Sequence, residues 1–157
     1  MRALVNALVD WPDRTARHFA WIGPLLARIV TGYVFMLSGW GKLNGLPVVI
    51  QNFIGWNIPF PQILAPFVSG VEFFGGILLL LGLLTRFAGP ALAITMVVAI
   101  KSALWDQVDS LGTFLGFDET EYLALFVWLG VAGPGPVSLD HLLLRWYRRG
   151  EGVPRPA

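Results

Sequence analysis

The stretch from Ala65 to Thr85 constrains the fold of this chain more than any other segment. It reads APFVSGVEFFGGILLLLGLLT, and its one ionisable residue is Glu72. A helix of this length rises about 30 Å, which matches the hydrocarbon thickness of a bilayer. Burying a carboxylate inside such a helix is costly, so Glu72 is a candidate functional group and is expected to be paired with a cation.

The composition supports a membrane location. The chain has 157 residues, of which 55% are hydrophobic and 13% are charged. Soluble domains carry roughly 25% charged residues, so these values indicate an integral membrane protein. The absence of cysteine excludes disulfides and thiolate chemistry within the chain. No residue spacing suits a metal, and a net charge of +1 gives no reason to expect nucleic acid as a partner.

The apolar runs predict an all-α fold, an integral membrane four-helix bundle with short amphipathic interfacial segments. We divide the chain into a cytoplasmic or interfacial N-terminal tail, a transmembrane domain and a basic cytoplasmic C-terminal tail, at residues 1–20, 21–140 and 141–157. The four spans are expected at about 21–42, 63–85, 87–105 and 121–139. Prolines and glycines in the segment 43–62 exclude a further span, and they predict either a short surface helix or an apolar vestibule over the bundle.

The charges of the tails and connections predict the topology. Arginines lie in both tails and in the second connection, at Arg86, whereas the first connection is neutral and the third is wholly acidic. The positive-inside rule therefore places both termini in the cytoplasm. The C-terminal tail adds a basic amphipathic segment, with arginines at Arg145, Arg148 and Arg149.

Two further cations lie within the spans near Glu72. Counting 1.5 Å per residue places Arg28 about 10 Å from the inner boundary and Glu72 about 15 Å from the outer one. The same count places Lys101 about 21 Å from the inner side and Lys42 near the outer edge. Arg28 and Lys101 are therefore expected to flank Glu72. Alternatively, Lys101 extends outward to an acid of the third connection, namely Asp106, Glu119 or Glu121.

The buried charges have two interpretations. Glu72 and Arg28 could form a structural ion pair between two helices, with no chemistry attached. They could instead line a polar pocket for the head of an apolar ligand such as a quinone, with Glu72 as a proton relay. The candidate ligand-binding residues are Arg28, Tyr33, Lys42, Glu72 and Lys101. Glycines expected at close helix contacts, within the monomer or in a homo-oligomer, are Gly32, Gly39, Gly75 and Gly76.

Three motifs resemble those of the DoxX family of small four-helix bacterial membrane proteins. They are R-x3-G-x6-G-x2-K from Arg28 to Lys42, the sequence EFFGG beginning at Glu72, and the sequence GPGPVSLD at residues 133–140. The likeness covers roughly residues 27–140. In the last motif, four residues are expected to shape a turn: Gly133, Gly135, Ser138 and Asp140.

The resemblance implies a multi-pass protein of the bacterial cytoplasmic (inner) membrane that is linked to redox chemistry. Some relatives form the quinone-facing part of a thiosulfate:quinone oxidoreductase, and others accompany soluble enzymes of oxidative or thiol stress. The leading hypothesis is therefore a membrane subunit of a quinone-linked oxidoreductase system. The alternative is a non-catalytic scaffold whose basic tail docks a soluble redox enzyme or anionic lipid. A small transporter ranks last because no inverted repeat is recognisable.

Overall fold

The computed structural model describes residues 16–150, and all regular structure in this part of the chain is helical. The elements are α3 (Ile22–Asn44), α4 (Leu46–Gly55), α5 (Pro61–Leu81), α6 (Thr85–Ala99), the π-helix η2 (Ile100–Leu104), the 3-10 helix η3 (Trp105–Gln107), α7 (Leu111–Leu115), α8 (Asp118–Ala132) and α9 (Leu139–Gly150). The predicted all-α membrane fold is confirmed. Most of the predicted N-terminal tail and the end of the C-terminal tail lie outside the described residues.

Three continuous helical stretches are long and apolar enough to cross a membrane: Ala16–Asn44, Pro61–Leu81 and Thr85–Gln107. The fourth predicted span is shorter than expected. α8 has 15 residues and carries three acids in its first turn. It ends at Ala132, where the GPGP sequence predicts a sharp stop, and residues 133–138 of the fourth predicted span are not helical. The physical reason is that Gly133 and Gly135 have φ of +81° and +75°, which a helix cannot accommodate.

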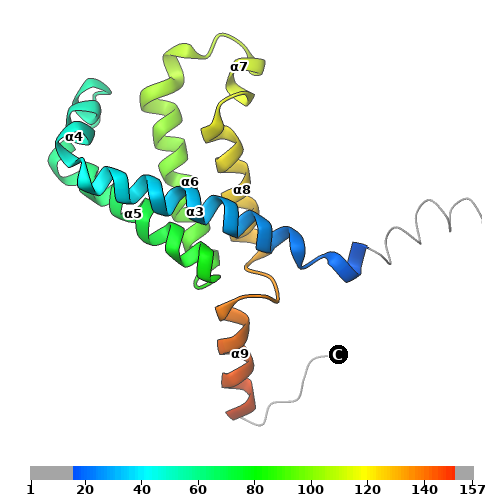
Figure 1. Cartoon of the computed structure of the whole chain (residues 1–157). Helices are drawn as coiled ribbons and strands as arrows, with labels where there is room; N and C mark the ends of the chain where they lie inside the picture. Colours follow the sequence, from blue (N-terminus) through cyan, green and yellow to red (C-terminus); the bar gives the residue numbers. More distant parts are fainter. Residues whose placement is uncertain (1–15, 151–157) are drawn as a thin grey trace, which may run out of the picture.

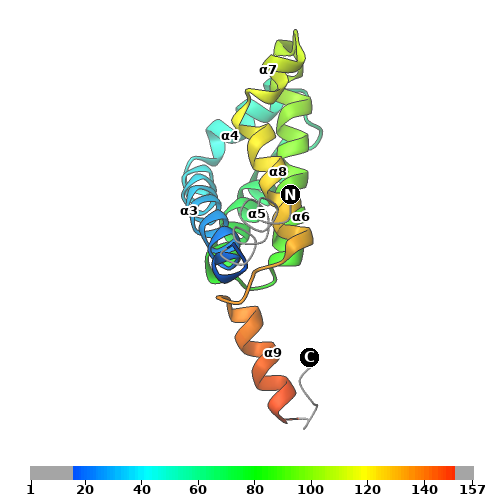
Figure 2. The ribbon, with the colours of Figure 1, turned by 90° about the vertical axis from the view of Figure 1, so that its right-hand side faces the viewer.

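The four long helices form two pairs. α3 packs along α5, α6 packs along α8, and the two pairs cross steeply (Figure 1). Their shared core is apolar and includes Leu79, Leu92, Phe126 and Leu129. The short helices α4 and α7 lie at one end of the molecule, and α9 projects from the other end (Figure 2).

Glycines set the register between α3 and α5. A Cβ on Gly39 would overlap the backbone of Phe73, and a Cβ on Gly76 would overlap the backbone of Met36. Gly32 likewise lies against the carbonyl of Gly76. The two helices therefore approach closely only because these positions lack side chains. Gly75 faces the other way, where a Cβ would press on Leu92 of α6 at 3.1 Å.

α4 forms within the segment that was expected to hold a short surface helix or a vestibule. This ten-residue helix packs on α5 and buries Phe53. The contacts of Gly39 with Phe73 and of Gly76 with Met36 set Asn44, the end of α3, opposite Val68, so the first turns of α5 extend beyond the end of α3. That arrangement places α4 over one end of the α3–α5 pair, where it closes one side of the cavity described next.

Candidate functional site

Glu72 is paired with Lys42. The Lys42 Nζ lies 2.7 Å from Oε1 and 2.6 Å from Oε2 of Glu72, and the Ser38 hydroxyl donates to Oε2 at 3.3 Å. The Glu72 side chain is 3% exposed, whereas that of Lys42 is 40% exposed. The pair therefore bridges α5 and α3, with the carboxylate buried and the ammonium partly open.

A cavity of about 450 Å³ lies beside this ion pair. Every long helix contributes to its wall, together with α4, the residues after it, and η2. The cavity includes Phe35, Ser38 and Lys42 of α3, Phe53, Trp56 and Ile58 at α4, Val68 and Glu72 of α5, Thr95, Met96 and Ala99 of α6, Ser102 and Leu104 of η2, and Asp118, Glu119 and Tyr122 of α8. Aromatic rings thus surround a buried ion pair.

The π-helical segment lies on the wall of this cavity. Ser102, Ala103 and Leu104 line it, although the Ser102 hydroxyl bonds back to the Val98 carbonyl at 2.6 Å. A short π segment inside an α-helix is frequent at functional sites because it redirects the side chains of one turn. Nothing in the sequence predicted this change of helix type.

The expected Arg28–Glu72 ion pair is wrong. Arg28 is 1% exposed and donates through Nη1 to the Pro134 carbonyl and through Nη2 to the Val137 carbonyl, both at 2.7 Å. Its Nε has no hydrogen-bond partner among the described residues. Arg28 therefore holds the α8–α9 connection at the opposite end of the bundle from the cavity.

The error arose from counting depth along each helix separately. The approach of Gly39 to Phe73 places Glu72 opposite Trp40. Along α3, Trp40 is two residues from Lys42 and twelve from Arg28, which correspond to about 3 Å and about 18 Å along the helix axis. Glu72 therefore lies near Lys42 and far from Arg28. α5 begins beyond the end of α3. A count from the first residue of α5 therefore placed Glu72 deeper in the membrane than the residue of α3 that it faces.

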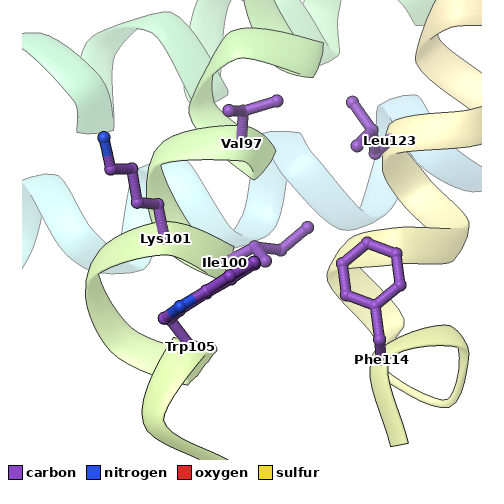
Figure 3. A pocket seen from close by; sticks show the side chains of 6 residues that line it. All are labelled: Val97, Ile100, Lys101, Trp105, Phe114 and Leu123. Carbon is purple, nitrogen blue, oxygen red and sulfur yellow. The ribbon is translucent and has the colours of Figure 1, made fainter. Parts of the chain in front are cut away.

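Lys101 and Tyr33 do not reach the cavity wall. Tyr33 is 54% exposed on the outside of α3. Lys101 borders a different hollow, an apolar groove of about 530 Å³ formed with Val97, Ile100, Trp105, Phe114 and Leu123. Its amine points away from Phe114 and Leu123 (Figure 3). Lys101 makes no ion pair with an acid of the third connection in the described part of the chain.

The last sequence motif forms a junction around the start of α9. Asp140 accepts hydrogen bonds from the backbone N–H groups of Leu84 at 3.0 Å and Thr85 at 3.3 Å, and its own N–H donates to the Gly82 carbonyl. Ser138 stays local: its hydroxyl donates to the Gly135 carbonyl at 2.8 Å and accepts from the N–H of His141. These bonds fasten α9 to the turn between α5 and α6.

The site contains residues that sequence reasoning missed. Ser38 precedes Lys42 by one helical turn, so the spacing alone placed it on the same face. Tyr122 and Trp56 lie far apart in the chain, and no local pattern predicts that they line the same hollow.

This arrangement can bind a flat ligand that carries hydrogen-bond acceptors. The ammonium of Lys42 has three N–H donors, and the carboxylate of Glu72 does not occupy all of them. The Ser38 hydroxyl donates to Glu72 and keeps its oxygen as an acceptor. Phe35 and Tyr122, whose ring centroids lie 5.1 Å apart, supply apolar faces. No group of three or more His, Cys, Asp or Glu residues capable of holding a metal occurs within residues 16–150.

Comparison with known proteins identifies the family. The DoxX family model matches residues 23–105. The "Putative oxidoreductase CatD" of Bacillus subtilis (strain 168) is 33% identical over 131 residues, which cover 82% of this chain and 92% of that protein. The "Inner membrane protein YqjF" of Escherichia coli (strain K12) is 32% identical over 78% of this chain and 92% of its own length. No solved structure matches the chain. The chain belongs to the DoxX family, with a membrane domain built of packed apolar helices.

Proposed function

We propose that this chain is a membrane subunit of a quinone-linked oxidoreductase system and that the cavity beside Lys42 and Glu72 binds the quinone ring. The observation that carries the proposal is a buried ion pair open to an aromatic-walled cavity of about 450 Å³. Ligand pockets for small molecules measure roughly 300–1,000 Å³ and are mostly apolar with a few polar groups. The name of CatD as a putative oxidoreductase supports the same class of chemistry.

The residues of the cavity fit a quinone ring by their donor set. Lys42 presents an N–H group to a carbonyl oxygen, Ser38 helps to hold the Glu72 carboxylate, and the surrounding rings exclude water from the faces of the ligand. A bound quinone supplies two-electron redox chemistry that this cysteine-free chain cannot perform with thiols. Lys42 donates a hydrogen bond to Glu72 at 2.6 Å, and in this proposal the pair holds or passes a proton at the edge of the ring.

The proposal includes a location. Two relatives, YqjF and YphA of Escherichia coli, are named as inner membrane proteins. We place this chain in the bacterial cytoplasmic membrane with both termini in the cytoplasm. In this orientation the cavity and the acidic connection face outward. The Arg28 junction and α9 then face the cytoplasm, where a soluble redox enzyme can reach them.

The quinone content of purified protein tests this function. Wild type, Glu72→Gln and Glu121→Gln are isolated from native membranes, and the quinone extracted from each is measured by mass spectrometry per mole of protein. Glu121 is the matched control because it lies on α8 but does not line the cavity. Wild type and Glu121→Gln retain quinone, and Glu72→Gln retains several-fold less. A wild-type protein without quinone contradicts the proposal.

One observation favours a second function, that of an anchor for a soluble redox enzyme. α9 projects from the bundle and exposes Leu142, Leu143 and Trp146, the last of which is 77% exposed, beside the basic residue Arg145. An exposed apolar stripe with a basic flank is typical of a docking surface.

The absence of cysteine makes the anchor function testable by crosslinking. A single cysteine at Leu143 is expected to crosslink to a soluble redox enzyme in intact cells. A single cysteine at Leu115 serves as the control, because this residue is 54% exposed, close to the 53% of Leu143, but lies in α7 at the opposite end. An unreactive Leu143 position, or equal crosslinking from both positions, argues against docking at α9.

A further inference from the structure

The wall of the cavity carries more negative than positive side chains. The wall contains three carboxylates, Glu72, Asp118 and Glu119, but one cation, Lys42. Lys42 and Glu72 neutralise each other through their contacts at 2.6 and 2.7 Å. The unbalanced charge of the cavity therefore comes from Asp118 and Glu119, at the start of α8.

Neither of these two acids is neutralised by a neighbouring side chain. Asp118 and Glu119 form no ion pair or side-chain hydrogen bond within the described part of the chain. Their place in the first turn of α8 suits the helix dipole, but that dipole contributes only about half a positive charge. Lys101 does not compensate, because it borders the groove of Figure 3 and not this cavity.

We infer that the cavity admits neutral or cationic ring ligands and rejects anionic ones. This inference rests on the proposed function and narrows its ligand to an uncharged quinone. An anion entering the cavity would meet two uncompensated carboxylates, and no free cation would receive it at the base because Lys42 is held by Glu72. An anionic electron donor must therefore deliver its electrons at another surface of the assembly.

Paired ligands test this selectivity. A neutral naphthoquinone and the same ring bearing one sulfonate are titrated against the full chain in nanodiscs of uncharged lipid. The neutral ring also partitions into the bilayer, so the ratio of the two affinities in wild type alone is not decisive. The measured quantity is the change in this ratio when the two acids are neutralised, in the double variant Asp118→Asn/Glu119→Gln.

The double variant is expected to improve the affinity for the sulfonated ring relative to the neutral ring by about tenfold, which corresponds to the loss of repulsion between unit charges at the cavity mouth. Glu121→Gln removes an acid from the same helical turn outside the cavity, so it controls for the loss of an acid that interacts with the helix dipole. It should leave the ratio unchanged. Raising the salt concentration should shrink the discrimination of wild type, because exposed charges are screened.

Two outcomes overturn the inference. One is an unchanged ratio in the double variant, and the other is an equal change in the double variant and in Glu121→Gln. If the neutral ring does not bind wild type at all, the proposed function fails and the inference falls with it. If the neutral ring binds wild type but either of those two outcomes is found, the inference alone fails and the proposed function stands.

Discussion

Two cations on one face of α3 have different surroundings. Lys42 meets a carboxylate beside an open cavity, and its side chain is 40% exposed. Arg28 lies fourteen residues earlier and is 1% exposed, with two backbone carbonyls as its partners. The cavity beside Lys42 has room for a ligand, whereas the Arg28 side chain is enclosed by protein and bonded to backbone carbonyls.

This contrast separates binding from structure in a single helix. A guanidinium bonded to two backbone carbonyls crosslinks the chain, and the Arg28 side chain is itself buried. An ammonium at the edge of a cavity can exchange one contact for another. A charged residue inside a membrane protein is therefore interpreted by the space around it as well as by its charge.

Neutralising Arg28 should cause the largest loss of stability. Arg28→Gln removes two charge-assisted hydrogen bonds that hold the α8–α9 connection, and each is worth about 1.5–3 kcal/mol. We expect the free energy of unfolding to fall by about 3–5 kcal/mol in total. Unfolding followed by circular dichroism in detergent measures the change. A variant as stable as wild type would show that the junction is not structural.

The close contact of α3 and α5 should give the next largest effect. Gly39→Ala places a methyl group into the Phe73 backbone, and such overpacking costs about 1–3 kcal/mol. Gly70→Ala is the matched control in α5, because a Cβ there meets nothing within 4 Å. Thermal unfolding of both variants is compared. Equal unfolding midpoints of the two variants would contradict the close contact of α3 and α5 at Gly39. They would also contradict the alignment of the two helices that brings Lys42 to Glu72.

Removing the Asp140 carboxylate should have a smaller effect. This side chain accepts from the N–H groups of Leu84 and Thr85 at the start of α6, where Leu84 has a φ of 50°. Asp140→Ala removes a helix cap, which is worth about 1 kcal/mol. Hydrogen exchange should report faster opening of the first turn of α6. Unchanged exchange there would show that the cap does not stabilise the turn.

Much of the fold could be predicted from local pattern. Long apolar runs predicted the spans, and helical periodicity placed Arg28, Gly32, Gly39 and Lys42 on one face. The partner of Glu72 could not be predicted, because it depends on the register between two helices. That register is set by backbone contacts at Gly39 and Gly76, which no count along a single helix contains.

The site was predicted less completely than the fold. Glu72 and Lys42 were identified as candidates, but the cavity wall combines residues from five separate segments. The end of α8 at Ala132 was predicted from the GPGP sequence, and the positive φ of Gly133 is its physical basis. The outward placement of Tyr33 follows from the pairing of α3 with α5, so it is likewise a tertiary property.

Glu72→Gln should affect stability least and ligand binding most. Gln keeps the shape of the side chain, and the partly exposed Lys42 can turn toward water once its partner is neutral. We expect a loss of stability of about 1 kcal/mol or less, because the substitution also removes the cost of burying the carboxylate and leaves Lys42 partly exposed to solvent. The midpoint of thermal unfolding should therefore stay close to that of wild type.

The affinity of a neutral quinone for three proteins tests the central claim most directly. Wild type, Glu72→Gln and Arg28→Gln are titrated in nanodiscs at a temperature at which all are folded. We predict that Glu72→Gln binds about tenfold more weakly, equivalent to about 1.4 kcal/mol, and that Arg28→Gln binds as wild type does. Equal affinity of wild type and Glu72→Gln, or a loss confined to Arg28→Gln, would contradict a ligand site at the Lys42–Glu72 pair.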